Sequence, residues 1–452
     1  ITEPEFHDQV KKAVAYARER GLKVALDLDA RLAREAFRSQ YPDEQQEMLR
    51  LRTIPLAASG EMELAIASEM LTDHMTGNTI PYAPLSGRLV RVYAYVGGEE
   101  GIRPETVQDI TERCIVKNAS RDEVRVNIPC DAQFEGHTAC VMAAFTHLTP
   151  DVYAPHLFAF QRAIVEQYAD VALSGLLKDE WGFPPCHGGC PLKNDFWFSA
   201  ARVEAYAAAT SGRDLIHDCL LMHAGEQGRE RERQSAINTL LKTSRERNAA
   251  VEEQYYDLAK GFFGSNAAVV THATWTPFPG PSEFKKNGLD WWAAKRDWGQ
   301  TDETTPFCVR TSLAKKWGGS AWYNQFYATN VPAYEESLWS HALGGGRINY
   351  HPIYPAPDGM DRLARSANLL ARNMVAGESR IRLIQLITRA PLDCPVAVVF
   401  GHACAMNWAG PAYKDVGLAV TNALWETGYY ADLVPTSEIE SGALRIDEDG
   451  AL

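Results

Sequence analysis

Hydrophobic positions near the start of the chain change from a helical spacing to a short continuous run. Apolar residues recur at helical spacing over Thr2–Gly21, and Gly21 stands where a helix C-cap belongs. The segment that follows, Leu22–Asp29, is an apolar run bounded by polar residues, which predicts a buried parallel strand. A helix, a glycine and a buried strand ending in aspartate form the αβ unit of an α/β barrel.

This rhythm stops between about Pro55 and Pro150. Strand-like stretches follow one another there with little helical pattern between them, and turn-prone pairs such as Ser59-Gly60 and Gly97-Gly98 separate them. The stretches are Glu63–Ala67, Arg88–Val96, Glu123–Ile128 and Thr138–Thr146. They predict an all-β insertion, a small sandwich, inside the barrel.

Alternation of strands and helices resumes after Pro150. The predicted strands are Asp170–Leu177, Asn266–Trp275, Asp297–Glu303, Ser320–Ala328 and Arg347–Tyr354, and the predicted helices include His156–Tyr168 and a long helical stretch over Ser199–Lys260. After Pro391, the strand Pro395–Phe400, the helix Tyr413–Thr427 and the strand Tyr429–Val434 are typical of the opening of a doubly wound sheet. We therefore expect a (β/α)8 barrel over residues 1–54 and 151–390, an all-β insertion over 55–150 and the start of a doubly wound α/β domain over 391–452.

Composition narrows the class of protein. The 452 residues are 46% hydrophobic and 23% charged, which is ordinary for a globular chain. The 45 Lys and Arg against 58 Asp and Glu give a net charge of −13, which argues against a nucleic-acid or anionic-membrane partner. The longest apolar runs, such as Val396–Phe400, fall far short of the ~20 residues that span a bilayer. We therefore predict that the chain is not a membrane protein.

The cysteines and the first residue bear on the compartment. Nine cysteines is an odd number, scattered without a disulfide framework, and favours reduced thiols. The sequence opens with Ile1 and no charged-plus-apolar leader, which suggests a processed or excerpted chain. We leave the localisation open between cytoplasm and periplasm.

Candidate chemistry follows from the ends of the predicted strands, because catalytic groups of α/β barrels stand at the carboxyl ends of the strands. The polar candidates there are Asp27, Asp29, Glu180, His272, Asp302, Glu303, Asn324 and His351, with the aromatic residues Trp275, Trp298 and Trp322 nearby. Flat aromatic rings stack on sugar faces, and beside carboxylates they favour a carbohydrate site. The alternative is that the aromatic residues only fill the core.

Glu180 is the strongest single candidate. It ends a predicted buried strand, and a carboxyl group against apolar walls has a raised pKa and stays protonated as a general acid. The alternative is a structural glutamate paired, for example, with Arg31. A glycosidase also needs a second carboxylate, and Asp302 or Glu303 lies about two strands further around the predicted barrel. Those two residues also suit the start of a helix.

Cys186-His187-Gly188-Gly189-Cys190 has some resemblance to a zinc-binding segment, although its spacing is not Cys-x-x-Cys. We favour a glycine-rich substrate loop, and we predict no metal and no cofactor. The sequence contains no P-loop, no Gly-x-Gly-x-x-Gly, no His-Glu-x-x-His and no Gly-x-Ser-x-Gly. Phosphoryl transfer, dinucleotide redox chemistry and lipase-type hydrolysis therefore lack their usual motifs.

The order of parts, with an acidic strand end at Glu180 and a doubly wound unit opening at Pro395–His402, resembles the family 42 β-galactosidases. The β insertion and the pair Asp179-Glu180 are also similar to the family 106 α-L-rhamnosidase barrel. The resemblance implies a (β/α)8 barrel, a C-terminal domain of glutamine-amidotransferase-like fold and a homo-oligomer, and it carries the acid role onto Glu180. Those galactosidases place a nucleophilic Glu at the end of the seventh strand, whereas Trp322–Tyr327 contains no carboxylate.

We therefore expect a glycoside hydrolase that cleaves a terminal sugar from a glycan. Glu180 would be the acid, and Asp302 or Glu303 would supply the second carboxylate. One alternative is a polysaccharide lyase in which Tyr323 or His272 removes a proton beside a uronate. The other is a catalytically inactive carbohydrate-binding barrel, which the missing seventh-strand Glu favours.

Overall fold

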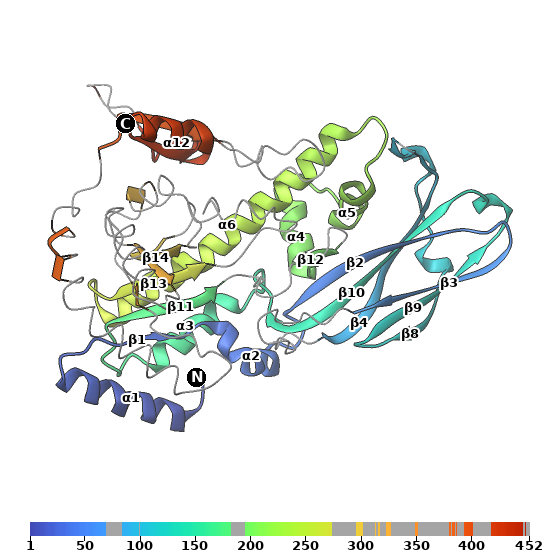
Figure 1. The fold of residues 1–452 in the computed structure, drawn as a ribbon. Helices are drawn as coiled ribbons and strands as arrows, with labels where there is room; N and C mark the ends of the chain where they lie inside the picture. The colour runs from blue at the N-terminus through green and yellow to red at the C-terminus, as the bar shows by residue number, and fades with distance from the viewer. Residues whose placement is uncertain are drawn as a thin grey trace, which may run out of the picture.

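A computed structural model describes residues 1–68, 84–98, 100–181, 195–273, 295–301, 322–326, 349–350, 393–400 and 417–445, with single positions at 312, 315–316, 379–380, 382–384, 386 and 448. For residues 179–181, 272–273, 298–301, 322–326, 349–350 and 418, the description covers the backbone alone. Figure 1 shows the course of the chain.

A parallel sheet organises the α/β part of the protein. Its strands are β1 (Ala25–Asp27), β11 (Gly175–Trp181), β13 (Ala268–Ala273), β14 (Trp298–Thr301), β15 (Trp322–Phe326) and β16 (Asn349–Tyr350), and they neighbour one another in chain order. Every neighbouring pair is parallel. Parallel strands in chain order are typical of a barrel, whereas a doubly wound sheet reverses its order. Among the described residues no pairing joins β16 to β1, so the fold is a mixed α/β fold in which a closed barrel is not shown.

The elements predicted over the described residues of this part exist, with shifted ends. Helix α1 (Pro4–Glu19) ends before Gly21, whose φ of +71° places it in the left-handed region, as expected of a C-cap glycine. Helix α3 (Leu157–Gln167) agrees with the prediction. The strand predicted at Asp170–Leu177 begins only at Gly175. Its polar start explains the shift, because Asp170 lies in a turn at the surface and binds His7 and Lys11.

Three helices fill the long helical stretch. They are α4 (Ala200–Ala209), α5 (Leu215–Ala224) and α6 (Glu230–Phe263), and two of them begin with a capping side chain. Ser199 accepts a hydrogen bond from the Arg202 amide, and Asp214 accepts one from the Ile216 amide. The 34-residue α6 runs past the parallel sheet and contacts β11 and β13 (Figure 1).

Antiparallel strands form the second part, on the right of Figure 1. One sheet has the order β12-β2-β10-β4-β7 and a second the order β3-β9-β8. The strands are β2 (Gln45–Pro55), β3 (Gly60–Ala67), β4 (Pro84–Tyr95), β7 (Gln108–Asp109), β8 (Ile115–Ala119), β9 (Glu123–Cys130), β10 (Thr138–Pro150) and β12 (Asp195–Phe198), with a small β5–β6 pair at Gly97–Gly98 and Gly101–Ile102. A separate apolar core, including Val92, Val126 and Phe145, lies between the sheets. The first strand, β2, begins at Gln45, ahead of the expected start at 55.

The last part is a parallel βαβ unit. Strand β17 (Val396–Phe400) pairs with β18 (Ala431–Pro435), and α12 (Leu418–Glu426) connects them. A short helix α13 (Thr436–Glu440) follows. Within the described part of the chain, no helix is both long and apolar enough to cross a membrane.

Candidate active site

The carboxyl ends of β1 and β11 lie side by side. The two strands are parallel, and Asp27 stands opposite Leu177 in the register. Asp27 is partly exposed, and its Oδ1 accepts a hydrogen bond from the Asp29 amide at 3.0 Å. The predicted site residues Asp27 and Glu180 therefore belong to the same edge of the sheet.

Two side chains hold the chain where it leaves β1. The amide of Gln161 on α3 donates to the Leu28 carbonyl at 2.8 Å and accepts from the Ala30 amide at 2.9 Å. The Tyr255 hydroxyl on α6 accepts from the Leu28 amide at 3.0 Å and donates to the Leu177 carbonyl at 3.2 Å. These bonds satisfy buried backbone groups and fix the ends of β1 and β11 relative to each other.

Asp29 has a different environment from Asp27. Its side chain is fully buried, and it binds Arg31 through the backbone amide at 2.8 Å and the guanidinium at 3.0 Å. Burial alone would raise the pKa of Asp29, but the charges of Arg31 and Lys178 and the hydrogen bonds from Arg31 hold it below its ordinary value. The carboxylate is ionised and occupied by Arg31, so its contacts are those of a structural group.

A β-bulge occupies the end of β11. Lys178 pairs with Thr271 and Trp181 with Ala273, so the register shifts by one residue between the two pairs. Asp179 and Glu180 together stand opposite the single residue His272. Bulges of this kind redirect side chains and are over-represented next to active sites. The side chains of Asp179 and Glu180 lie outside the described atoms.

Directly before the bulge lies a buried lysine. The Lys178 side chain is 0% exposed, and its Nζ lies 4.2 Å from the centroid of the Tyr255 ring. Desolvation lowers the pKa of Lys178 to about 8, although the charges of Asp29 and Glu252 oppose this shift. An ammonium over an aromatic face gains cation–π attraction, which increases when water is excluded.

An ion pair continues this cluster along α6. Glu252 and Arg296 are both fully buried at their side chains, with 2.6 Å between Oε1 and Nε. Desolvation raises the pKa of Glu252, against the charges of Arg296 and Lys178. We call Asp27, Asp29, Arg31, Lys178, Glu252 and Arg296 the strand-end charge cluster. Its three acids and three bases balance when all are ionised.

The remaining predicted site residues divide into two groups. His272, Trp298, Trp322 and Asn324 have described backbones on β13, β14 and β15. His272 neighbours the bulge, and Trp298 lies level with Asp27 through Leu177 and Val270. Trp275, Asp302, Glu303 and His351 lie outside the described residues, as does the segment Cys186–Cys190.

Sequence reasoning missed the role of Lys178. A lysine directly after Leu176-Leu177 in a buried run is the signal that identifies it, because lysine is almost never fully buried without a partner. Sequence reasoning also offered Arg31 as a partner of Glu180. In the structure Arg31 binds Asp29, and the Glu180 side chain lies outside the described atoms. Within the described residues, no group of three or more His, Cys, Asp or Glu side chains is arranged to hold a metal ion.

Comparisons with known proteins add little to this geometry. No protein-family model matches the chain, and no curated protein matches it. Among solved structures, it is similar to a β-galactosidase from Rahnella sp. R3, with a TM-score of 0.40 and 11% identity over 64% of this chain. The match spans half of that β-galactosidase chain. A likeness of this size carries no argument about fold or activity.

Proposed function

We propose that this protein is a glycoside hydrolase that removes a terminal sugar from a glycan, with Glu180 as the general acid. The observation that supports the proposal is the bulge at the carboxyl end of β11. It sets Asp179 and Glu180 opposite His272, on the edge of the parallel sheet that also carries Asp27. Enzymes with parallel strands in chain order have their catalytic groups at this edge.

The proposal assigns a role to each remaining residue. Asp302 or Glu303 attacks the anomeric carbon or activates water, while Glu180 protonates the leaving oxygen. Trp275, Trp298 and Trp322 stack on the sugar, and Asp27, His272, Asn324 and His351 bind hydroxyl groups. The wider proposal is a complete (β/α)8 barrel with a β insertion, a C-terminal amidotransferase-like domain and a homo-oligomeric assembly.

Hydrolysis of a panel of α- and β-aryl glycosides, with wild-type protein and Glu180→Gln, tests the activity. The panel includes several leaving groups of different acidity for each sugar. A variant that lacks the general acid loses most rate on poor leaving groups and least on good ones, because good leaving groups need little protonation. We expect a loss of about 10²–10⁴-fold on the poorest leaving group.

The control is Glu204→Gln, at an exposed position on α4, which should keep the wild-type rate on every substrate. If Glu180→Gln slows all substrates by one factor, Glu180 is not the acid. If wild-type protein hydrolyses nothing, double-bond absorbance on uronate polymers tests the lyase. Sugar binding without turnover, indifferent to Glu180→Gln but weakened by Asp27→Asn, would identify the inactive binding barrel.

A further inference from the structure

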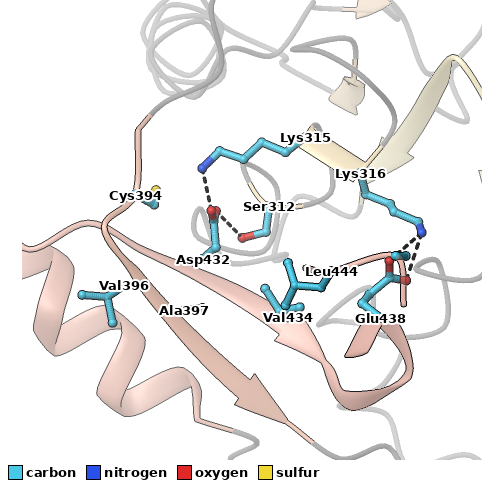
Figure 2. A pocket seen from close by; sticks show the side chains of 11 residues that line it. Ser312, Lys315, Lys316, Cys394, Val396, Ala397, Asp432, Val434, Glu438 and Leu444 are labelled. Carbon is cyan, nitrogen blue, oxygen red and sulfur yellow. Dashed lines mark hydrogen bonds and ion pairs between the residues drawn. The ribbon is translucent and has the colours of Figure 1, made fainter. Parts of the chain in front are cut away.

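A cavity of about 430 Å³ lies beside the C-terminal βαβ unit. It is bounded by β17, β18 and α13 on one side and by Ser312, Lys315 and Lys316 on the other (Figure 2). Its lining shares no residue with β1, β11 or the strand-end charge cluster. A volume of this size falls in the range of pockets that take small molecules.

Two ion pairs provide the polar groups of the cavity. Lys315 binds Asp432 at 2.6 Å, and Lys316 binds both carboxylate oxygens of Glu438 at 2.7 and 3.0 Å. Ser312 fixes the first pair, because its hydroxyl donates to Asp432 at 3.0 Å and accepts from the Leu433 amide at 3.0 Å. These contacts hold the polar groups in place before any ligand arrives, which lowers the cost of binding.

Electrostatics favour a neutral ligand. Desolvation alone would lower the pKa of Lys315, but the hydrogen bond and charge of Asp432 raise it overall, so the ammonium keeps its proton. Desolvation and the charge of Asp432 raise the pKa of Cys394, so this thiol stays neutral at pH 7. Two lysines and two carboxylates then sum to zero. Because the net charge of the cavity is zero, neither an anionic nor a cationic ligand would gain electrostatic binding energy from it.

The cavity nevertheless offers both donors and acceptors. An ammonium carries three N–H donors and a carboxylate has about four acceptor positions, more than the contacts within each pair use. Between the two pairs lie the apolar side chains of Val434 and Leu444 (Figure 2). Asp432 and Val434 are two residues apart in β18 and share one face of the strand.

From this arrangement we propose that the cavity binds a neutral monosaccharide or disaccharide at a site separate from the proposed active site. A pyranose presents hydroxyl groups, each both donor and acceptor, around its rim, and an apolar C–H face. The rim meets the two ion pairs, and the C–H face meets Val434 and Leu444. Binding at this site requires no hydrolysis, so a test of the binding is independent of a test of the proposed function.

Calorimetry and saturation-transfer NMR on the full chain test the site. The probes are D-galactose, D-glucose, L-rhamnose and N-acetyl-D-glucosamine, with D-glucuronate and D-glucosamine as charged comparators. We expect at least one neutral sugar to bind more tightly than its charged comparators. Asp432→Asn and Glu438→Gln should each weaken this binding by about tenfold, because a hydrogen bond to a charged group is lost.

Leu444→Trp fills the cavity without changing its charge and should abolish the binding. If Asp432→Asn fails to fold, the binding measured with Leu444→Trp still tests whether the cavity is the sugar site. The matched control is Glu63→Gln, which breaks the exposed ion pair with Arg125 in the β insertion. Glycoside hydrolysis, measured on the same proteins, should be unchanged in all four variants.

Two results would overturn the site. One is the absence of any neutral-sugar binding by wild-type protein. The other is binding that Glu438→Gln and Leu444→Trp leave unchanged, which would mean that the ion pairs only connect β18 and α13 to Lys315 and Lys316. Binding without turnover would keep this site while removing the proposed function, and turnover without this binding would do the reverse.

Discussion

The ammonium of Lys178 lies 4.2 Å from the ring centroid of Tyr255, and both side chains are excluded from solvent. The two residues come from different layers, since Lys178 is on β11 and Tyr255 is on α6. Lys178 immediately precedes Asp179 and Glu180. The strand that carries the proposed acid therefore contains a buried charged side chain directly before that acid. Such a charge makes stability depend on pH.

Stability should rise with pH between about 8 and 10.5 because of Lys178. Its folded pKa is about 8, against an ordinary value of 10.5, so in this window the unfolded chain holds a proton that the native protein has released. Below about pH 8 both states are protonated, and above 10.5 both are neutral. The gain is on the order of 3 kcal/mol. Urea unfolding at several pH values measures it.

Lys178→Met should remove this rise, since methionine does not titrate. Lys242→Met, at an exposed position on the same helix that carries Tyr255, is the control and should follow the wild-type curve. Equal pH slopes for wild type and Lys178→Met would show that Lys178 keeps an ordinary pKa in the folded protein.

Tyr255→Phe should destabilise the protein by about 1–3 kcal/mol. The substitution keeps the ring beside Lys178 but removes the hydroxyl that accepts from the Leu28 amide and donates to the Leu177 carbonyl. A buried amide then loses its partner. Tyr256→Phe is the matched control, because its hydroxyl contacts the partly exposed Asp297 and its loss should cost less. Urea unfolding measures the stability of both variants, and an equal loss of unfolding free energy in the two would contradict the prediction.

Stability should fall as pH rises from about 4 to 6 because of Asp151. Desolvation raises the pKa of this fully buried carboxyl to about 6, although the Ser199 hydroxyl and the charges of Arg202 and Arg247 oppose the shift. Between the unfolded value of 3.8 and about 6, the native protein holds a proton that the unfolded chain has released. The loss is on the order of 2–3 kcal/mol.

Asp151→Asn should remove that acid-side dependence, and thermal unfolding at pH 4, 5, 6 and 7 measures it. Asp122→Asn changes an exposed aspartate and serves as the control. If Asp151→Asn and wild type lose stability in parallel over this range, another carboxyl group is responsible.

Short-range patterns predicted much of this fold. The helical spacing before Gly21 gave α1, and the continuous apolar run at Val396–Phe400 gave β17, because local periodicity encodes both. The start of β11 was less predictable. Asp170 belongs to the surface through contacts with His7 and Lys11, more than 150 positions away, and no local pattern encodes such a contact.

The candidate site was predictable only in part for the same reason. The sequence predicts acidic residues at the strand ends, Asp27 and Glu180, because each stands at the end of an apolar run. The bulge depends on pairing with β13, about 90 residues further along, and the lowered pKa of the buried Asp29 depends on Arg31 and Lys178. The register between distant strands and the charges of neighbouring side chains determine these two features. The sequence of one strand is therefore not enough to predict them.

The Glu252–Arg296 pair should show strong coupling between its two members. Both side chains are fully buried, and they connect α6 to the segment before β14 at 2.6 Å. Glu252→Gln leaves the Arg296 charge without its carboxylate, and Arg296→Met leaves the Glu252 charge without its guanidinium. Each single variant should lose about 3–5 kcal/mol of unfolding free energy, because an uncompensated buried charge remains.

The double variant Glu252→Gln/Arg296→Met removes one charge of each sign and keeps the cluster neutral. It should be more stable than either single variant, so the coupling energy from a double-mutant cycle by urea unfolding should exceed the loss of each single variant, about 3–5 kcal/mol. The exposed pair of Lys242 and Glu246 on α6 provides the comparison, and its cycle should give less than about 0.5 kcal/mol. Additive losses at Glu252 and Arg296 would mean that the two charges are compensated separately, by Lys178 and by the rest of the strand-end charge cluster.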